Sequence, residues 1–223
     1  KGFSREELDS FSAESYRRAR EAQGSGFFDS EIVPVEVPQR KGDPVVVSQD
    51  EEPGRGRPEK LGELRPAFAK DGVTTAGNAS SINDGAAAIV LASAAAVEKY
   101  GLKPIGKIVA YAQHAQEPEW FTTAPAQAIA KLLDKVGKSV EDIATFEVNE
   151  AFAVVAMVTA REVGIPSEKL NPHGGAVSIG YPIGMTGTRL VATALNSLKP
   201  GELGIASPCI GGGEATAVLV ERL

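Results

Sequence analysis

The stretch ATFEVNEAFAVVAMVTAREVG, residues 144–164, decides the fold class because it joins a strand directly to a helix. Residues 144–148 are typical of a short strand, and the apolar run after them predicts a helix that ends before Gly164. Asn149 and Glu150 lie where the strand becomes the helix, and open α/β sheets bind ligands at the carboxyl ends of strands. From the local sequence alone, a helix N-cap is the simpler interpretation of Asn149.

Strands and helices are predicted to alternate on both sides of this stretch. Apolar segments predict further strands at residues 86–93, 105–112, 203–207 and 215–220. Helical periodicity predicts helices at residues 94–101, 129–136 and 190–198. Alternation of this kind indicates a layered α/β domain.

The first sixty residues predict a helix and, later, an irregular segment. Ser4 and Glu7 form a capping-box pattern, which indicates a helix that begins there. Residues 49–60 combine prolines, glycines and mixed charge, and they predict a loop. In that loop, Arg55 or Arg57 either faces solvent or contacts a phosphate.

The composition excludes several classes of protein. The 223 residues have a net charge of −6, which argues against nucleic acid or an acidic membrane surface as a partner. A single cysteine excludes an internal disulfide and a cysteine-rich zinc site, and no apolar run reaches the roughly 20 residues of a membrane span. The first ten residues lack the apolar core of a signal peptide, so we expect a cytoplasmic location.

Two glycine-rich segments are candidates for a site that brings the backbone close to a ligand. Residues 171–187 contain five glycines and two prolines, and the helix after them could offer N–H groups to an anion. Residues 209–215, CIGGGEA, place the only cysteine beside glycines whose amides could face an oxyanion. Cys209 is then a nucleophile, a proton carrier or a small core residue, and a lone cysteine is usually the last of these.

Five segments together resemble the thiolases of the acetyl-CoA acetyltransferase type. They are RPAF (65–68), TAGNASSINDGAAA (75–88), NEAFA (149–153), NPHGGAVSIGYPIG (171–184) and CIGGGEA (209–215). The resemblance implies the carboxyl-terminal half of a thiolase, with a layered α-β-α fold. It further implies the latter part of a loop domain at residues 1–81 and the carboxyl-terminal thiolase domain at residues 82–223.

The resemblance also implies a role for each matching residue. Thiolases run a Claisen condensation or its reverse, with one cysteine that takes the acyl group and a second that moves a proton; Cys209 matches the second. Gly211 matches a glycine whose amide helps to form an oxyanion hole, and Asn149 matches an asparagine that holds an oxyanion-hole water. The residues that match contacts to coenzyme A are Ala76, Ala79, Ser80, Ala151 and Phe152. Coenzyme A is a substrate in this family, so no metal or resident cofactor is implied.

Two departures from the family pattern argue against a working enzyme in this chain alone. The acyl-accepting cysteine lies in the amino-terminal half of thiolases, and this sequence has no cysteine besides Cys209. Tyr181 stands where the family has the histidine of Gly-His-Pro. A tyrosine, with a reference pKa of about 10, is a poor base but still donates a hydrogen bond. His173 is a second candidate for the base, and Ser81 replaces a glycine that is usual in relatives.

The resemblance therefore predicts acyl transfer between acetyl-CoA or a 3-oxoacyl-CoA and coenzyme A, as in fatty acid metabolism. The amino-terminal half would come from a missing segment or from a separate chain. We expect a homo- or hetero-oligomer, because an isolated carboxyl half exposes the apolar face that normally packs on the other domain. The alternative is a non-catalytic thiolase-like protein that binds coenzyme A or serves in assembly.

Overall fold

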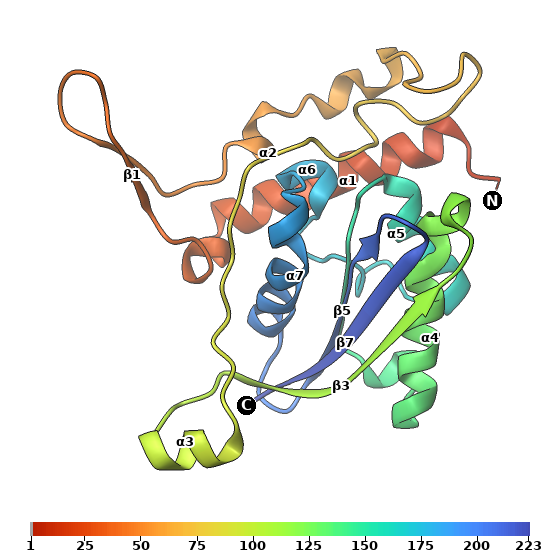
Figure 1. Ribbon diagram of the computed structural model, residues 1–223. Helices are drawn as coiled ribbons and strands as arrows, with labels where there is room; N and C mark the ends of the chain where they lie inside the picture. Colours follow the sequence, from red (N-terminus) through yellow and green to blue (C-terminus); the bar gives the residue numbers. More distant parts are fainter. Residues whose placement is uncertain (1) are drawn as a thin grey trace.

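The computed structural model describes residues 2–223 and is built around one mixed sheet (Figure 1). Its strands are β3 (Gly106–Ala115), β4 (Thr145–Val148), β5 (Leu203–Ser207), β6 (Cys209–Ile210) and β7 (Glu214–Arg222). The strand order is β3-β7-β5-β4, and β6 pairs with β7 off this path. β4 and β5 are parallel, whereas β3 and β5 are both antiparallel to β7, which lies between them.

Helices cover both faces of the sheet. The three long ones in this region are α4 (Ala124–Val136), α5 (Ala153–Val163) and α7 (Ile183–Ser197). Ile129 of α4 packs with Phe146 and Val148 of β4 in one buried cluster, and Leu195 of α7 packs with Val220 of β7 in another. The sheet is therefore the middle layer of an α-β-α arrangement, which confirms the predicted fold class. Every strand and helix predicted from residue 94 onward is present.

A long amino-terminal helix, α1 (Arg5–Gly24), lies across the domain. The predicted capping box is present, because Ser4 Oγ accepts from the Glu7 N–H at 3.2 Å and a Glu7 carboxylate oxygen accepts from the Ser4 N–H at 2.6 Å. Leu8 is buried, and the helix packs against α5 and against the short α6 (Ala176–Ile179). The segment that leads to the candidate residue Tyr181 thus rests on α1.

Short elements make up most of the remaining regular structure. They are η1 (Phe27–Ser30), β1 (Val35–Val37), β2 (Val45–Val47), α2 (Glu52–Arg55), η2 (Pro58–Glu63), α3 (Ala94–Tyr100), η3 (Pro118–Thr123) and η4 (Val140–Asp142). β1 and β2 form an exposed antiparallel hairpin that projects from the body (Figure 1). The loop predicted at residues 49–60 contains α2 and part of η2, so it is more ordered than predicted. Within residues 2–223, no helix is long and apolar enough to cross a membrane.

The prediction of a buried strand at residues 86–93 is wrong. These residues form no strand, and Val90 and Leu91 are 91% and 74% exposed. Apolar composition suits burial, but a strand also requires a neighbour that pairs with its N–H and C=O groups. Residues 2–223 supply no such neighbour here. The helix predicted next is present as α3, which ends at Gly101 in the left-handed conformation.

Candidate active site

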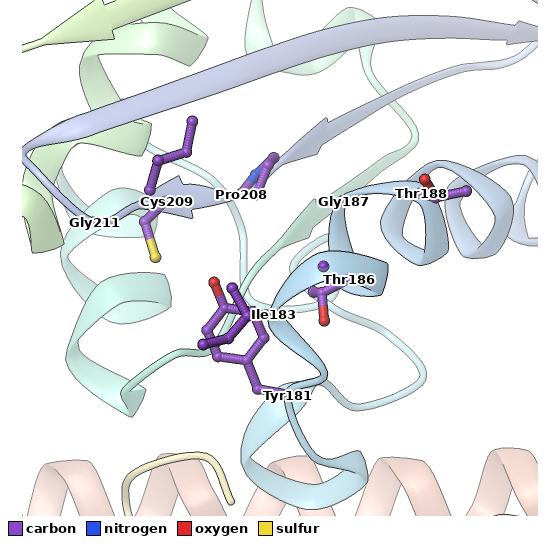
Figure 2. A pocket seen from close by; sticks show the side chains of 10 residues that line it. Tyr181, Ile183, Thr186, Gly187, Thr188, Pro208, Cys209 and Gly211 are labelled. Atoms are coloured by element: carbon purple, nitrogen blue, oxygen red, sulfur yellow. The ribbon is translucent and has the colours of Figure 1, made fainter. Parts of the chain in front are cut away.

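The three predicted segments meet at one end of the sheet. Asn149 directly follows β4, Cys209 begins β6, and Tyr181 lies just before α7. Cys209 is buried in a small cluster with Ala151 and Val155, and the Tyr181 ring packs against that cluster. Figure 2 shows the Tyr181 hydroxyl and the Cys209 thiol pointing toward one another. The fold therefore brings together residues that are far apart in the sequence.

A cavity of about 360 Å³ opens beside these side chains. It lies between the start of α7 and the connection from β5 to β6, and its lining includes Tyr181, Thr186, Pro208, Cys209 and Gly211 (Figure 2). Small-molecule sites usually have volumes of roughly 300–1,000 Å³. The cavity is therefore large enough for the reacting end of a small substrate.

Asn149 is fully buried, and its side-chain amide has no hydrogen-bond partner among residues 2–223. The backbone of Asn149 is held, because its N–H donates to the Ser207 carbonyl at 3.1 Å. Helix α5 begins at Ala153 after the N-cap residue Phe152, so the N-cap interpretation of Asn149 is wrong. Leaving a buried amide unsatisfied costs free energy, and such an amide is suited to a ligand or a water molecule.

Burial and neighbouring groups shift the pKa values of Cys209 and Tyr181. Burial raises the pKa of the Cys209 thiol, and the nearby Asn149 amide opposes this increase. Burial also raises the pKa of the Tyr181 hydroxyl; a charge on Cys209 would raise it further, whereas Asn149 lowers it. Neither contact of Asn149 has the geometry of a hydrogen bond, so these effects reflect proximity alone. Both Cys209 and Tyr181 therefore hold their protons near neutral pH.

The glycines after Cys209 differ in what they contribute. Gly212 and Gly213 have positive φ angles of 102° and 93°, and a Cβ on Gly213 would lie 2.2 Å from the Gln116 carbonyl oxygen. Gly211 has neither feature, but it lines the cavity beside Cys209. The turn thus requires glycine at residues 212 and 213, whereas Gly211 is placed where its backbone can face a ligand.

Four of the five residues predicted to contact coenzyme A lie side by side, and the fifth, Ala76, lies apart from them. Ala79 forms a β-bridge with Phe152, and the Ser80 N–H and Oγ both donate to the Ala151 carbonyl, at 3.1 and 3.0 Å. These four residues therefore form one surface next to the site. Ala76 is exposed on the turn that precedes them. Phe68, to which the sequence assigned no role, lies edge-on to the Phe152 ring at 6.1 Å between centroids. It belongs to the RPAF segment, which was the available signal.

The same segment also holds Tyr181. The Tyr181 N–H donates to the Ser81 carbonyl at 3.1 Å and lies 3.2 Å from Asn83 Oδ1. A Cβ on Gly180 would lie 2.2 Å from Asn83 Oδ1, so only glycine allows this close approach. Ser81 Oγ donates to Glu52 Oε2 at 3.0 Å, a contact that glycine at this position could not make. Residues 79–83 therefore link the Asn149 side of the site to the Tyr181 side.

Two other candidates lie away from the cavity or are already engaged. His173 stacks on the Phe27 ring at 3.5 Å between centroids, and burial lowers its pKa. It does not line the cavity, so the structure gives no support to His173 as the replacement base.

Arg55 pairs with the carboxylates of Glu51 and Glu52. Among residues 2–223, no group of three or more His, Cys, Asp and Glu could hold a metal ion.

Two carboxyl groups behind the site are buried, which the sequence did not predict. Glu150 is 1% exposed and accepts hydrogen bonds from Ser15 Oγ, Asn171 Nδ2 and the Val177 N–H. Glu147 is 0% exposed and lies 3.3 Å from a guanidinium nitrogen of Arg189. Burial raises the pKa of both carboxyl groups. Glu150 was noticed at the strand–helix junction, but its partners come from α1 and the 171–178 segment, which no local pattern indicates.

Comparison with known proteins shows which family models the chain matches. A family model described as "Thiolase, C-terminal domain" matches residues 102–222, and one described as "Thiolase, N-terminal domain" matches residues 1–95. The prediction of a carboxyl-terminal half alone is therefore too narrow, because residues of both family domains are present.

Individual relatives match along nearly the whole chain. An acetyl-CoA acetyltransferase of Yarrowia lipolytica is 48% identical over 222 residues, which cover 100% of this chain and 56% of the relative. A thiolase of Ascaris suum, solved in complex with coenzyme A, is 48% identical with a TM-score of 0.94 over 99% of this chain and 56% of that one. The dimeric peroxisomal thiolase of Saccharomyces cerevisiae is 40% identical with a TM-score of 0.93, over 99% of this chain and 56% of its own. The chain thus spans about half the length of these relatives.

Proposed function

Because this chain belongs to the thiolase family, we propose that it serves acyl transfer between acetyl-CoA or a 3-oxoacyl-CoA and coenzyme A. One observation carries the proposal. The Cys209 thiol, the Tyr181 hydroxyl and the unsatisfied Asn149 amide converge beside one cavity. Convergence of an acid–base group with hydrogen-bond donors is what proton abstraction next to a thioester requires.

In the condensation direction, Cys209 as thiolate removes a proton from the α-carbon of a bound acetyl-CoA. The electron pair of the broken C–H bond moves toward the carbonyl, and the thioester oxygen gains negative charge. Asn149, through a water molecule, and the Tyr181 hydroxyl would stabilise that oxygen, and the Gly211 amide would serve a second oxyanion. Burial of Cys209 raises its pKa, so the thiolate must form when substrate is bound.

The acyl-accepting cysteine is the part of this reaction that the 223 residues do not provide, because Cys209 is their only cysteine. We propose that it comes from a region corresponding to the rest of the relatives' length, either on the same polypeptide or on a separate chain. The chain by itself would then bind acyl-CoA without completing acyl transfer. The proposed binding surface comprises Ala76, Ala79, Ser80, Ala151 and Phe152.

Tyr181 is the residue that we expect to limit the rate of catalysis. Its raised pKa leaves even less of the deprotonated form at neutral pH than a free tyrosine has, so it cannot take over activation of a nucleophile there. General acid–base catalysis contributes about 10²–10⁴-fold to a rate. The site should therefore be slow compared with one that has histidine at this position.

The second candidate function is coenzyme A binding without catalysis, and Tyr181 is the observation that favours it. In both cases we propose an oligomer, since the Saccharomyces cerevisiae relative is described as dimeric. A reduced Cys209 suits a reducing compartment such as the cytoplasm. The division into a loop-domain part at residues 1–81 and a carboxyl-terminal domain at 82–223 stays a prediction.

The decisive experiment combines binding and turnover. Calorimetry with coenzyme A would be run on the 223-residue chain, and thiolysis of acetoacetyl-CoA on an assembly that supplies the second cysteine. We expect binding by the chain, slow thiolysis by the assembly, and a rise of about 10²–10⁴-fold in the Tyr181→His variant. Binding with no thiolysis in either form would favour the non-catalytic function, and absence of binding would contradict both.

A further inference from the structure

Glu147 and Arg189 form a buried pair between β4 and α7. Arg189 Nη1 donates to Glu147 Oε2 at 3.3 Å, and their side chains are 12% and 0% exposed. The two residues are 42 positions apart in the chain. Neither contacts the cavity, so the pair is not part of the acid–base site described above.

The pair lies directly behind the residues that form the site. Glu147 precedes Asn149 by two residues, and side chains two apart along a strand point to the same face of the sheet. The pairing of β4 with β5 continues through the Asn149 N–H, which donates to the Ser207 carbonyl, so this alternation extends to Asn149. Arg189 lies in the second turn of α7, a helix that starts immediately after Tyr181 and its N-cap residue Pro182.

A second, partly buried carboxyl group contacts the same helix farther along. Glu31, at the end of η1, accepts from Thr193 Oγ1 at 2.8 Å and from Asn196 Nδ2 at 3.1 Å, and both donors lie on α7. The charged groups near Glu147 are Arg189, which favours its ionised form, and Glu31 and Glu150, which oppose it. Arg189 is therefore the cation that acts on Glu147, in a region that holds three buried or partly buried carboxyl groups.

This arrangement is a poor way to gain stability. Glu147 Oε1 and Arg189 Nη2 have no hydrogen-bond partner within residues 2–223, and removing a guanidinium and a carboxyl group from water is costly. Apolar residues of similar volume often replace such pairs with little loss of stability or with a gain. What an apolar pair lacks is a directional contact that distinguishes one position of the helix from another.

We propose that Glu147 and Arg189 are positioning residues, whose contact sets the place of α7 on β4 and so holds Tyr181 opposite Asn149 and Cys209. Their importance for acyl transfer rests on the proposed function, but the geometric claim does not. If the contact is lost, both the start of α7 and the end of β4 can shift, so that Tyr181 and Asn149 no longer face Cys209 as closely. Asn149, two residues after Glu147, is the neighbour that opposes the rise in the Cys209 pKa, so its displacement leaves that pKa higher.

Cys209 is the only cysteine, so its alkylation by iodoacetamide reports on one site. The rate would be measured against pH for the 223-residue chain and for the Arg189→Met, Glu147→Leu and Glu147→Gln variants. We expect the first two to shift the midpoint upward by about one pH unit, and so to slow alkylation about tenfold at a fixed lower pH. Glu147→Gln keeps an oxygen that accepts from Arg189, so it should retain the original profile. The matched control is Arg17→Met, which removes an exposed arginine paired with Glu14 and Glu21 and should leave the profile unchanged.

Circular dichroism would establish that each variant is folded. If the single variants do not fold, the double variant Glu147→Met with Arg189→Met provides an apolar pair of similar volume. We expect that variant to fold and to show the upward shift. A folded variant that lacks the contact and keeps the original pH profile would overturn the proposal. This readout needs no turnover, so a chain that fails to support thiolysis would still test it.

Discussion

Two apolar stretches of this chain, residues 86–91 and residues 145–148, end in opposite environments. Every residue of β4 is buried, and Phe146 exchanges backbone hydrogen bonds with the 169–171 segment, in addition to the parallel pairing of β4 with β5. Residues 86–91 lie along the surface without regular structure, and Val90 is 91% exposed. Apolar composition thus shows which segments are suited to burial, but a strand forms only where another segment supplies backbone partners and a covering layer.

A large contrast is expected from shortening one side chain in each stretch. Phe146→Ala should lower the free energy of unfolding by about 3–5 kcal/mol, because it leaves a cavity between the sheet and α4. Val90→Ala should change it by less than about 0.5 kcal/mol, because that side chain already faces water. Urea unfolding followed by circular dichroism measures both. Similar losses in the two variants would show that residues 86–91 are packed in solution.

A contrast of similar size concerns the buried carboxyl group of β4. Burial raises the pKa of Glu147 from 4.5 to about 8, so the folded chain keeps a proton that the unfolded chain releases. The contribution of this group to stability therefore falls as pH rises from about 4.5 to about 8. Glu147→Gln should remove a fall on the order of 5 kcal/mol over this range.

Thermal or urea unfolding at several pH values measures that slope. The matching substitution at an exposed carboxyl group, Glu98→Gln on α3, should leave the slope unchanged. If Glu147→Gln and the unmodified chain lose stability in parallel as pH rises, the Glu147 carboxyl group does not carry the effect.

The smallest contrast compares two serine N-caps. Ser4 caps α1, which packs on the body, and Ser93 caps α3, which has no buried residue. Ser4→Ala should lower the global stability by about 1 kcal/mol, whereas Ser93→Ala should fray α3 without changing the main unfolding transition. Hydrogen exchange of the helix amides, together with the melting temperature, would separate local from global effects. A global loss in the Ser93 variant would mean that α3 is coupled to the core.

The candidate site shows the same division between local and long-range information. Motifs were enough to select Cys209, Tyr181 and Asn149, and the fold places all three together. Cys209 is buried in a small apolar cluster and also lines the cavity. Its place in the core therefore does not exclude the functional role that we propose for it. The N-cap interpretation of Asn149 failed because α5 starts three residues later than that interpretation assumes.

Local sequence by itself determined where some of the elements begin or end. The Ser4–Glu7 capping box starts α1, and Gly101 and Gly164 end α3 and α5 in the left-handed conformation that glycine tolerates best. These features depend on backbone groups within a few residues of one another, so a short window of sequence contains the relevant interactions.

Only the tertiary structure decided which apolar segment is covered and which buried polar groups meet. Residues 86–93 have a strand-like composition but no partner, and Glu147 meets Arg189 from 42 positions away. Burial, desolvation and long-range hydrogen bonds depend on the arrangement of elements in space, which no local pattern specifies. For that reason the motifs selected the groups that we propose act on a substrate, whereas the buried pair that we propose positions them became visible only in the folded chain.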